Sequence, residues 1–491
     1  MDDTWGGNTM TRRRNEYMRE ITKFYIDGQW VEPAEFNIVD VINPATEKAA
    51  GHVALGTAAD VDAAVDAARR AFATWSKTTV DERVDVLNAV VAEYQKRMGD
   101  LAAAVTEEMG APSGLSGNVQ VPIGLAHLMT AAAQLPAFSF SEDRGSSRIV
   151  KEPIGVCGFI TPWNWPLNQV MCKVAPAMAT GCTMILKPSE VAPFSAAIVA
   201  EIFDAAGVPA GVFNLVNGDG PGVGTALATH PGIDMVSFTG STRAGIEVAK
   251  NAAPTVKRVA QELGGKSPNI ILDDEDFAKN VAGGVAAMMM NSGQSCNAPT
   301  RMLVPASRMD EAAEAALSVA PTLTVGDPTS SVRMGPVVSE AQFTKIQGLI
   351  ERGIAEGAKP VFGGPGRPDD LPTGYYVRPT VFRDVTNDME IARTEIFGPV
   401  LVMIGYDSLD DAIEIANDTD YGLAGYVSGK DVDAVRDVGS RIRAGSISLN
   451  GAQLDPVAPF GGYKQSGNGR EWGDYAFDEF LEVKSLLGYG A

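Results

Sequence analysis

The decapeptide "NSGQSCNAPT" (residues 291–300) surrounds Cys296 with small and amide side chains. Such neighbours leave a thiol accessible and offer it hydrogen bonds, but they pack poorly as a core. A reactive cysteine requires this kind of setting, because its thiolate must be both reachable and stabilised. An ordinary loop cysteine would fit the same ten residues, so this segment alone leaves both interpretations open.

Glu262 is the best candidate for a base that would serve this thiol. The segment "QELGGKSPN" (261–269) places it after an apolar strand and before a Gly-Gly turn. One carboxylate with a buried end is usually structural, but one that faces a cysteine is a candidate general base. The three histidines, His52, His127 and His230, are each isolated, which disfavours a zinc cluster and any other metal site. No GxSxG motif is present, which disfavours a Ser-His-Asp hydrolase.

Asn164 is a candidate hydrogen-bond donor for this chemistry. In "ITPWNWPLNQ" (160–169) two tryptophans flank the asparagine and two prolines bracket them. Rigid aromatic and proline residues around one amide suit a site in which a hydrogen-bond donor must keep a fixed position beside a developing negative charge. An aromatic corner of the core is the alternative.

Two further segments could hold a dinucleotide. In "VSFTGSTRAG" (236–245) an apolar strand reaches Gly240-Ser241 and then opens a helix, whose free amides suit a diphosphate. A plain serine helix cap is the alternative. "TMILKPSE" (183–190) ends a strand with Lys187 and Glu190, and such a pair can donate and accept hydrogen bonds with the hydroxyls of a ribose. The carboxylate would also repel a 2′-phosphate, which favours NAD over NADP. A surface ion pair is the alternative.

Two glycine-rich segments fail as phosphate-binding motifs. "NGDGPGVG" (217–224) lacks the third glycine of the dinucleotide fingerprint, and "ELGGKS" lacks the first glycine of a P-loop. A glycine-rich turn before a helix can still approach a phosphate closely.

The elements that must position these residues are predicted to be alternating strands and helices. "YIDGQWVEP" (25–33) predicts a hairpin, and helical spacing of apolar residues covers 57–75 and 81–109. Strands and helices then alternate from residue 154, and a second alternating block runs from 268 to 449. This rhythm predicts two α/β domains with parallel sheets, which bind ligands at the carboxyl ends of their strands.

Composition narrows the function classes. The 491 residues carry a net charge of −21, which disfavours a nucleic-acid partner because phosphate binding needs a basic surface. No apolar run reaches the roughly 20 residues of a membrane-spanning helix. The first twenty residues lack the apolar stretch of a secretion signal and are expected to be a frayed extension, with Met10 or Met18 as possible natural starts. Cysteine usage indicates a cytoplasmic protein without disulfides.

Together, these segments resemble the NAD(P)-dependent aldehyde dehydrogenases. The resemblance covers nearly the whole chain and includes, in order, "TPWNWP", "LKPSE", "FTGST", "ELGGKSPNII", "NSGQSCNAPTR", "EIFGPV" and "PFGGYKQSG". The segment "GQSCNAPTRMLVP" is most similar to that of bacterial catabolic aldehyde dehydrogenases, which act on semialdehydes and other non-retinoid aldehydes.

The resemblance implies a role for each matching residue. Cys296 would attack the aldehyde carbon, while Asn164 and the Cys296 backbone N–H would hold the developing oxyanion. Glu262 would activate water on the thioester, and Lys173 would lie on the proton pathway. The cofactor contacts implied are Ile160, Thr161, Trp163, Lys187, Glu190, Gly220, Gly224, Gly240, Ser241, Leu263, Glu395 and Phe397. The substrate-tunnel positions implied are Trp165, Asn168, Gln169, Cys172, Ser295, Asn297 and Leu454.

Two expectations concern the chemistry of this site. An unperturbed thiol is mostly protonated near neutrality, so the site is expected to favour the thiolate through local amides and a bound cationic nicotinamide. Asn168 and Gln169 predict a partly polar tunnel, and none of the tunnel positions is Lys or Arg, so an obligatory dicarboxylic semialdehyde is not indicated.

The resemblance also implies an architecture and leaves alternatives. An NAD-binding domain would span 1–139 and 154–264, a catalytic domain 265–464, and an oligomerisation element 140–153 with 465–491. Dimers or tetramers are expected. The alternatives are an acylating enzyme that passes the thioester to coenzyme A, a thiol esterase or amidase, and a non-enzymatic structural homologue such as a lens protein. Glu262 favours hydrolysis to a free acid, and the presence of every expected catalytic residue disfavours a structural protein.

Overall fold

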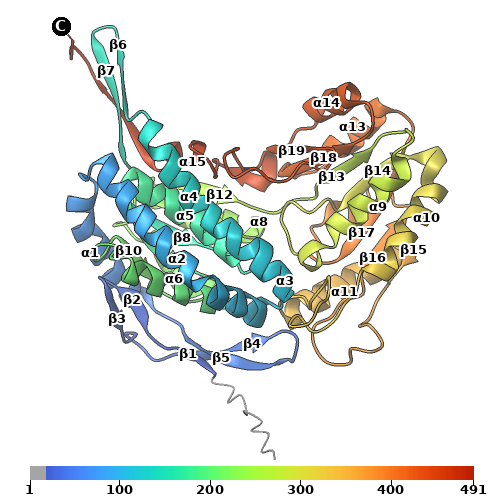
Figure 1. The fold of residues 1–491 in the computed structure, drawn as a ribbon, viewed down its shortest axis with the longest axis horizontal. Helices are drawn as coiled ribbons and strands as arrows, with labels where there is room; N and C mark the ends of the chain where they lie inside the picture. The colour runs from blue at the N-terminus through green and yellow to red at the C-terminus, as the bar shows by residue number, and fades with distance from the viewer. Residues whose placement is uncertain (1–17, 491) are drawn as a thin grey trace, which may run out of the picture.

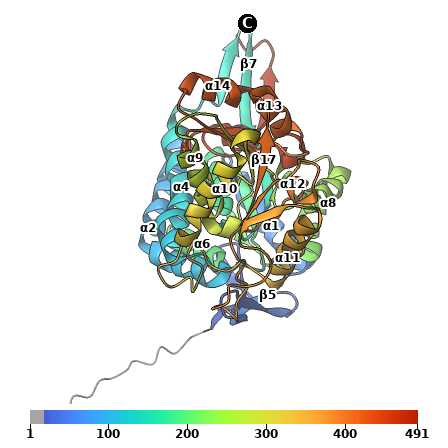
Figure 2. The ribbon, with the colours of Figure 1, turned by 90° about the vertical axis from the view of Figure 1, so that its right-hand side faces the viewer.

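The computed structural model describes residues 18–490, which form two α/β units that lie side by side (Figure 1). A long arm of strands projects from one end, beside the C-terminus (Figures 1 and 2). Each unit is built on its own sheet, and all strands of the first sheet except β20 (Gly467–Asn468) precede those of the second in the chain. The predicted α/β class is confirmed.

The first unit contains an eight-stranded sheet with the order β20-β12-β11-β8-β9-β10-β2-β3. Its five central strands are parallel, and the strands at its two edges are antiparallel. The strands are β2 (Phe24–Ile26), β3 (Gln29–Val31), β8 (Val156–Ile160), β9 (Thr183–Lys187), β10 (Phe213–Leu215), β11 (Met235–Thr239), β12 (Arg258–Glu262) and β20 (Gly467–Asn468). The helices of this unit are α1 (Ala58–Trp75), α2 (Val80–Met109), α3 (Ser113–Leu115), α4 (Val121–Gln134), α5 (Pro166–Thr180), α6 (Phe194–Ala205), α7 (Thr225–Thr229), α8 (Thr242–Ala252) and α15 (Tyr475–Glu479).

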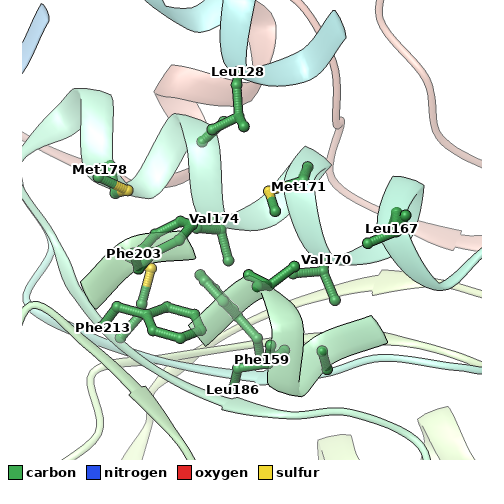
Figure 3. Close-up of a cluster of buried hydrophobic side chains, with 14 of the residues drawn as sticks. Leu128, Phe159, Leu167, Val170, Met171, Val174, Met178, Leu186, Phe203 and Phe213 are labelled. Carbon is green, nitrogen blue, oxygen red and sulfur yellow. The ribbon is translucent and has the colours of Figure 1, made fainter. Parts of the chain in front are cut away.

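Helix α5 lies at the centre of this unit, and all of its residues are buried. Figure 3 shows Val170 and Val174 on the side of α5 that faces the sheet, with Leu128 of α4 on the opposite side. A helix enclosed on both sides is held rigidly, because close packing leaves few alternative rotamers. Its side chains therefore provide fixed positions for a site at its N-terminal end.

Local sequence signals account for the elements that were predicted. In the β2–β3 hairpin, Asp27 and Gly28 have φ angles of 53° and 75°, the left-handed geometry that a tight Asp-Gly turn requires. Helix α2 begins with a capping box between Thr79 and Glu82 and ends at Gly110, whose φ is 75°. These predictions are confirmed to within a residue or two.

The second unit contains a seven-stranded sheet with the order β15-β16-β17-β14-β13-β18-β19. All neighbouring strands are parallel except β15, which pairs antiparallel with β16. The strands are β13 (Pro268–Ile271), β14 (Arg301–Pro305), β15 (Lys359–Phe362), β16 (Thr380–Arg383), β17 (Val400–Tyr406), β18 (Ala424–Ser428) and β19 (Ser446–Leu449). Its helices are α9 (Phe277–Met288), α10 (Met309–Val319), α11 (Glu340–Ala355), α12 (Glu390–Arg393), α13 (Leu409–Asn417) and α14 (Val432–Arg441).

Two small sheets complete the fold. The arm consists of β6 (Ser141–Arg144), β7 (Ser147–Pro153) and β21 (Leu481–Leu486), with the tail strand β21 paired antiparallel to β7. The other sheet contains β1 (Arg19–Ile21), β4 (Ile38–Asn43) and β5 (Lys48–Ala54). Because β1 pairs with β5, the end of the expected N-terminal extension is an ordered strand; residues 1–17, with Met10, lie outside the described residues.

Three details bear on the sequence interpretation. Residues Gly220–Gly224 form a π-helical turn that leads into α7, so the glycine-rich segment does open a helix. The short strand β20 falls within the range 465–491 but pairs with β12, so this part of that range belongs to the first sheet. No helix within residues 18–490 is long and apolar enough to cross a membrane.

Candidate active site

The carboxyl ends of the central strands in the first sheet bring four predicted segments to one edge. Lys187 ends β9, Thr239 ends β11 just before Gly240, and Glu262 ends β12, while Thr161 directly follows β8. These strands are neighbours in the order β12-β11-β8-β9. Parallel strands that end at the same edge gather their last side chains into one site.

Lys187 and Glu190 form an ion pair, but it is not the surface pair that was considered as an alternative. Lys187 is only 3% exposed and donates hydrogen bonds to Glu190 Oε2 at 3.1 Å and to the Pro188 carbonyl at 3.0 Å. Burial lowers the pKa of Lys187, and Glu190 partly offsets this effect. A buried ammonium that faces a partly exposed carboxylate is a rigid, directional site for hydroxyl groups.

Ser241 caps helix α8 in this structure. Its hydroxyl accepts a hydrogen bond from the Ala244 N–H at 3.3 Å, which is the geometry of the plain helix cap. The cap leaves other amides of the first turn available to an anion. A Cβ added at Gly220 would meet no atom within 4 Å, so the backbone there is open to close approach, and Gly224 lies beside Ile160 and Lys187.

Several buried polar atoms at this edge have no partner among the described residues. They are Thr161 Oγ1 after β8, both amide atoms of Asn217 after β10, and Thr239 Oγ1 at the end of β11. Buried polar groups are almost always hydrogen-bonded, because leaving one unsatisfied costs about 1–3 kcal/mol. Orphaned donors and acceptors at adjacent strand ends fit a ligand rich in hydroxyl and phosphate oxygens. Asn217 was not predicted as a site residue, although it begins the glycine-rich segment "NGDGPGVG" and follows an apolar strand.

Glu395 lies against the turn that follows Glu262. Its Oε1 accepts the Gly265 N–H at 3.0 Å, and its own carbonyl accepts Lys345 Nζ at 2.9 Å. Burial raises the pKa of Glu395, while the Gly265 hydrogen bond and Lys345 act in the opposite direction. Lys345 was also missed, since nothing in its local sequence distinguishes it from a surface lysine.

Aromatic and apolar residues line the same region. Phe397 adopts a left-handed conformation with φ of 60° and packs edge-on against Trp163, with ring centroids 5.4 Å apart. Ile160 and Leu263 belong to the buried apolar cluster beneath the strand ends. These residues place aromatic and apolar surface beside the polar groups at the strand ends.

Cys296 sits in a tight turn that precedes β14, and its side chain is partly exposed. The turn closes through a 3.1 Å hydrogen bond from the Ala298 N–H to the Ser295 carbonyl. Asn164 Nδ2 donates to the Gln294 carbonyl at 3.1 Å, and Trp165 Nε1 donates to Ser295 Oγ at 2.8 Å. The segment that starts α5 therefore holds the turn that carries the thiol.

The expectation that this site favours the thiolate included a bound cationic nicotinamide and stays a prediction; in the chain without a ligand, the surroundings of Cys296 disfavour the thiolate. Burial raises the pKa of Cys296, and the nearby carboxylates Glu262 and Glu395 raise it further. The N–H groups of Asn297 and Cys296 lower it, but by less. Two carboxylates that face the sulfur outweigh the local amides, since a like charge disfavours ionisation.

Glu262 is 4% exposed, and neither carboxylate oxygen has a hydrogen-bond partner among the described residues. Burial raises its pKa well above the ordinary value, and Glu471 adds to the rise, whereas Lys173 and Arg470 lower it. The Cys296 carbonyl packs against Gly265, three residues after Glu262, so the turn that carries the thiol lies against the segment that follows β12. A carboxylate without a partner is free to accept a proton.

Lys173 is buried on α5 and forms an ion pair with Glu471. It also donates to Ser237 Oγ at 3.0 Å, and Cys172 Sγ contacts Glu471 Oε2 at 3.2 Å. Burial opposes the charged form of Lys173, but Glu471 and Cys172 raise its pKa above the ordinary value. Glu471 was missed in the sequence, although a lysine in an otherwise apolar helix requires a buried counter-charge.

The expected tunnel residues divide into two groups. Cys172 belongs to an apolar cluster with Leu423, Phe460 and Trp472, against which Cys296 packs. The polar group consists of Asn168, whose Oδ1 accepts from His127 Nε2 at 2.7 Å, and the buried Gln169, whose Oε1 has no described partner. Leu454 is exposed.

No role in the reaction was predicted for Cys157, Cys182, His52 or His230. Cys157, Cys172 and Cys182 are buried and free. His52 contacts Glu20 and Asp40, and His230 contacts Asp62. Within residues 18–490, no group of three or more candidate ligands could hold a metal ion.

Comparison with known proteins places this site in a family. The model of the aldehyde dehydrogenase family matches residues 30–486. A relative from Pseudomonas sp., 3-succinoylsemialdehyde-pyridine dehydrogenase, is 57% identical over 474 residues, which cover 96% of this chain and 99% of the relative.

Solved structures give the same result. A cysteine-to-alanine variant of aldehyde dehydrogenase C from Pseudomonas syringae, in complex with NAD+ and octanal, has a TM-score of 0.94 and 53% identity, covering 95% of this chain and 97% of that one. An aldehyde dehydrogenase from Mycobacterium tuberculosis in complex with NAD+ has a TM-score of 0.92 and 42% identity, covering 95% and 98%. The chain therefore belongs to the aldehyde dehydrogenase family.

Proposed function

We propose that this protein oxidises an aldehyde to the carboxylic acid with NAD+, using Cys296 as the nucleophile and Glu262 as the base for hydrolysis. The observation that carries this assignment is the meeting of the two groups. The turn that carries the partly exposed Cys296 thiol packs against Gly265, three residues after the buried Glu262, and neither Glu262 oxygen has a hydrogen-bond partner among the described residues.

NAD+ fits the edge of the first sheet. The orphaned Thr161, Asn217 and Thr239 groups, the Lys187–Glu190 pair and the first turn of α8 would hold the adenosine and diphosphate parts. Glu395 and Phe397 would hold the nicotinamide ribose and ring. Glu190 favours NAD over NADP because a carboxylate repels a 2′-phosphate. When bound, NAD+ supplies the acceptor for the hydride that leaves the aldehyde carbon.

The chain supplies the covalent steps. The Cys296 thiolate attacks the planar carbonyl carbon and makes it tetrahedral, as hydride release requires. The second N–H of Asn164 Nδ2 and the Cys296 backbone N–H stabilise the oxygen of this adduct. Glu262 then takes one proton from a water molecule, and the water oxygen attacks the carbonyl carbon of the resulting thioester. The C–S bond breaks, which releases the acid and leaves Cys296 as the thiolate. The Lys173–Glu471 pair lies behind Glu262 and would carry that proton away.

The substrate proposed is an aldehyde without an obligatory second carboxylate. The tunnel positions carry no Lys or Arg, and Asn168 with Gln169 adds polar groups to an otherwise apolar wall. The relatives named above act on a pyridine-bearing semialdehyde in one case and bind octanal in another. A screen of aliphatic, aromatic and terpenoid aldehydes by NADH formation would identify the preferred class.

We also propose a homo-oligomeric, cytoplasmic enzyme with the domain boundaries predicted from the sequence, except that β20 and α15, within 465–491, belong to the first unit. Strand β21 lies at an open edge of the arm sheet, and open edges favour pairing with a second chain.

The decisive experiment measures NADH formation by the parent enzyme and by Cys296→Ala, with and without coenzyme A. The parent should form NADH and free acid without coenzyme A, and the variant should bind NAD+ but form no NADH. Turnover by Cys296→Ala would reject the nucleophile, and dependence on coenzyme A would favour the acylating alternative.

A further inference from the structure

The turn that carries Cys296 is held from a third strand by Tyr426. Cys296 and Asn297 are the two central residues of the turn, which is closed by the Ala298 N–H. The carbonyl of Asn297 is not used by the turn itself. It accepts a hydrogen bond from Tyr426 Oη at 2.8 Å, although Tyr426 lies 129 residues further along the chain, on β18.

The orientation of this turn decides where its amides point. The Cys296 carbonyl packs against Gly265, where a Cβ would overlap it. Because the C=O and N–H of a planar trans peptide point in opposite directions, the Asn297 N–H points away from Gly265. The Asn297 N–H and the Cys296 N–H oppose the rise in the pKa of the Cys296 thiol that burial causes.

Two side chains hold the opposite ends of the turn. Trp165 Nε1 donates to Ser295 Oγ at 2.8 Å at its start, and Tyr426 holds the Asn297 carbonyl at its end. The titratable groups that face the sulfur are Glu262 from β12, Glu395 from the segment before β17, and Tyr426 itself. Since both carboxylates act against the thiolate, the turn amides are its local source of stabilisation.

We propose that Tyr426 is a positioning residue that keeps the amides of this turn directed at the Cys296 sulfur. It touches neither substrate nor cofactor and acts through the Asn297 carbonyl. The inference rests on the proposed function of Cys296 as nucleophile. Without the hydroxyl, only the Ala298 N–H holds the Asn297–Ala298 peptide, so the end of the turn loosens. The Cys296 and Asn297 amides, which belong to the two preceding peptides of the same turn, then lose their fixed direction toward the sulfur.

The test is Tyr426→Phe in the full-length protein, which removes one hydroxyl and keeps the ring. The rate of Cys296 alkylation by iodoacetamide, read from the mass of the labelled peptide, reports the thiolate fraction. We expect alkylation at each pH below the thiol pKa to slow about 10-fold, and kcat to fall by a similar factor. The KM for NAD+ should stay unchanged. Alkylation at the parent rate would overturn the proposal.

Tyr406→Phe is a matched control. Tyr406 lies on β17 of the same sheet, and its hydroxyl donates to the Ile271 carbonyl at 2.8 Å, away from the thiol. The Tyr406→Phe variant loses an equivalent tyrosine–carbonyl hydrogen bond and should leave the rate of Cys296 alkylation at the parent value. Equal slowing in both variants would mean a general loosening of the sheet and would overturn the proposal.

A second variant tests the other end of the turn. Ser295→Ala removes the acceptor of Trp165 and should also slow alkylation. In the double variant the two effects should be less than multiplicative, because both act on one turn; fully multiplicative effects would contradict a shared mechanism. Alkylation does not require turnover, so failure of the proposed function would appear separately, as NADH formation by Cys296→Ala.

Discussion

Asn164 has two amide N–H groups, and one of them bonds the Gln294 carbonyl and anchors the turn before Cys296. The other has no hydrogen-bond partner among residues 18–490, and we propose that it serves the oxygen of a bound aldehyde. A donor that is already fixed in place stabilises a developing charge without reorganisation, which is the largest single contribution in many active sites.

Replacing Asn164 by Ala should therefore slow the reaction more than it weakens binding. We expect kcat to fall by about 10²–10³, the usual effect of losing one oxyanion donor. The affinity for NAD+, measured by titration in the absence of aldehyde, should change little because Asn164 lies beside the thiol. Unchanged turnover would reject the oxyanion role.

Glu262 makes a prediction about the second half of the reaction. Its pKa is raised by burial and by Glu471, and a base must be deprotonated, so thioester hydrolysis should speed up as pH rises through this raised pKa. Glu262→Gln should give a burst of NADH in stopped-flow measurements and then stall, without that pH dependence. Steady turnover equal to that of the parent would contradict the assignment.

At the scale of elements, the site combines a regular, fully buried helix with a strained turn. Helix α5 is buried along its whole length and presents Lys173 to the site from a fixed frame. The turn residues before Cys296 are strained instead, since Asn291 and Ser292 both have φ of 54°. Strain of this kind persists only where the surroundings enforce it, and it is commonly found at functional sites.

The first turn of α2 gives a prediction about stability alone. Thr79 Oγ1 accepts the Glu82 N–H at 3.2 Å, while Glu82 Oε2 accepts the Thr79 N–H at 2.7 Å. Thr79→Ala removes half of this capping box and should lower the free energy of unfolding by about 1 kcal/mol. Urea denaturation followed by circular dichroism measures the change. The rate per folded molecule should stay at the parent value, and a loss of rate would mean that α2 influences the site.

At the scale of the whole molecule, two sheets share one site and a third leaves an open edge. Strand β21 brings the tail back to β7, and the arm projects away from both units (Figure 1). Val483 on this strand is 65% exposed. An open strand edge that carries an exposed apolar side chain favours contact with a second chain, because pairing covers both the backbone groups and the side chain.

Val483→Lys should therefore weaken association of the chains. We expect light scattering to show a smaller species than for the parent protein, because a lysine charge opposes burial in an interface. Leu317→Lys is a suitable control, since Leu317 is 51% exposed on α10 of the other unit. A parent protein that is monomeric, or an equal effect of both variants, would contradict the proposed oligomerisation element.

The sequence by itself determined the α/β class, the β2–β3 hairpin, the starts and ends of α1 and α2, and the family. Each of these depends on short-range physics. Asp27-Gly28 specifies its turn, and Thr79 with Glu82 specifies a helix start, whatever the rest of the chain does. The family motifs likewise named Cys296 as a candidate before any geometry was known.

Only the tertiary structure decided which distant side chains contact one another and how those contacts change the pKa values in the site. Glu471 pairs with Lys173 across 298 residues, and Tyr426 reaches the Cys296 turn across 129. Burial and the approach of Glu262 raise the pKa of Cys296, against the expectation from its polar neighbours. The reason is that burial and charge pairing depend on which strands become neighbours, and no local pattern of side chains records that order.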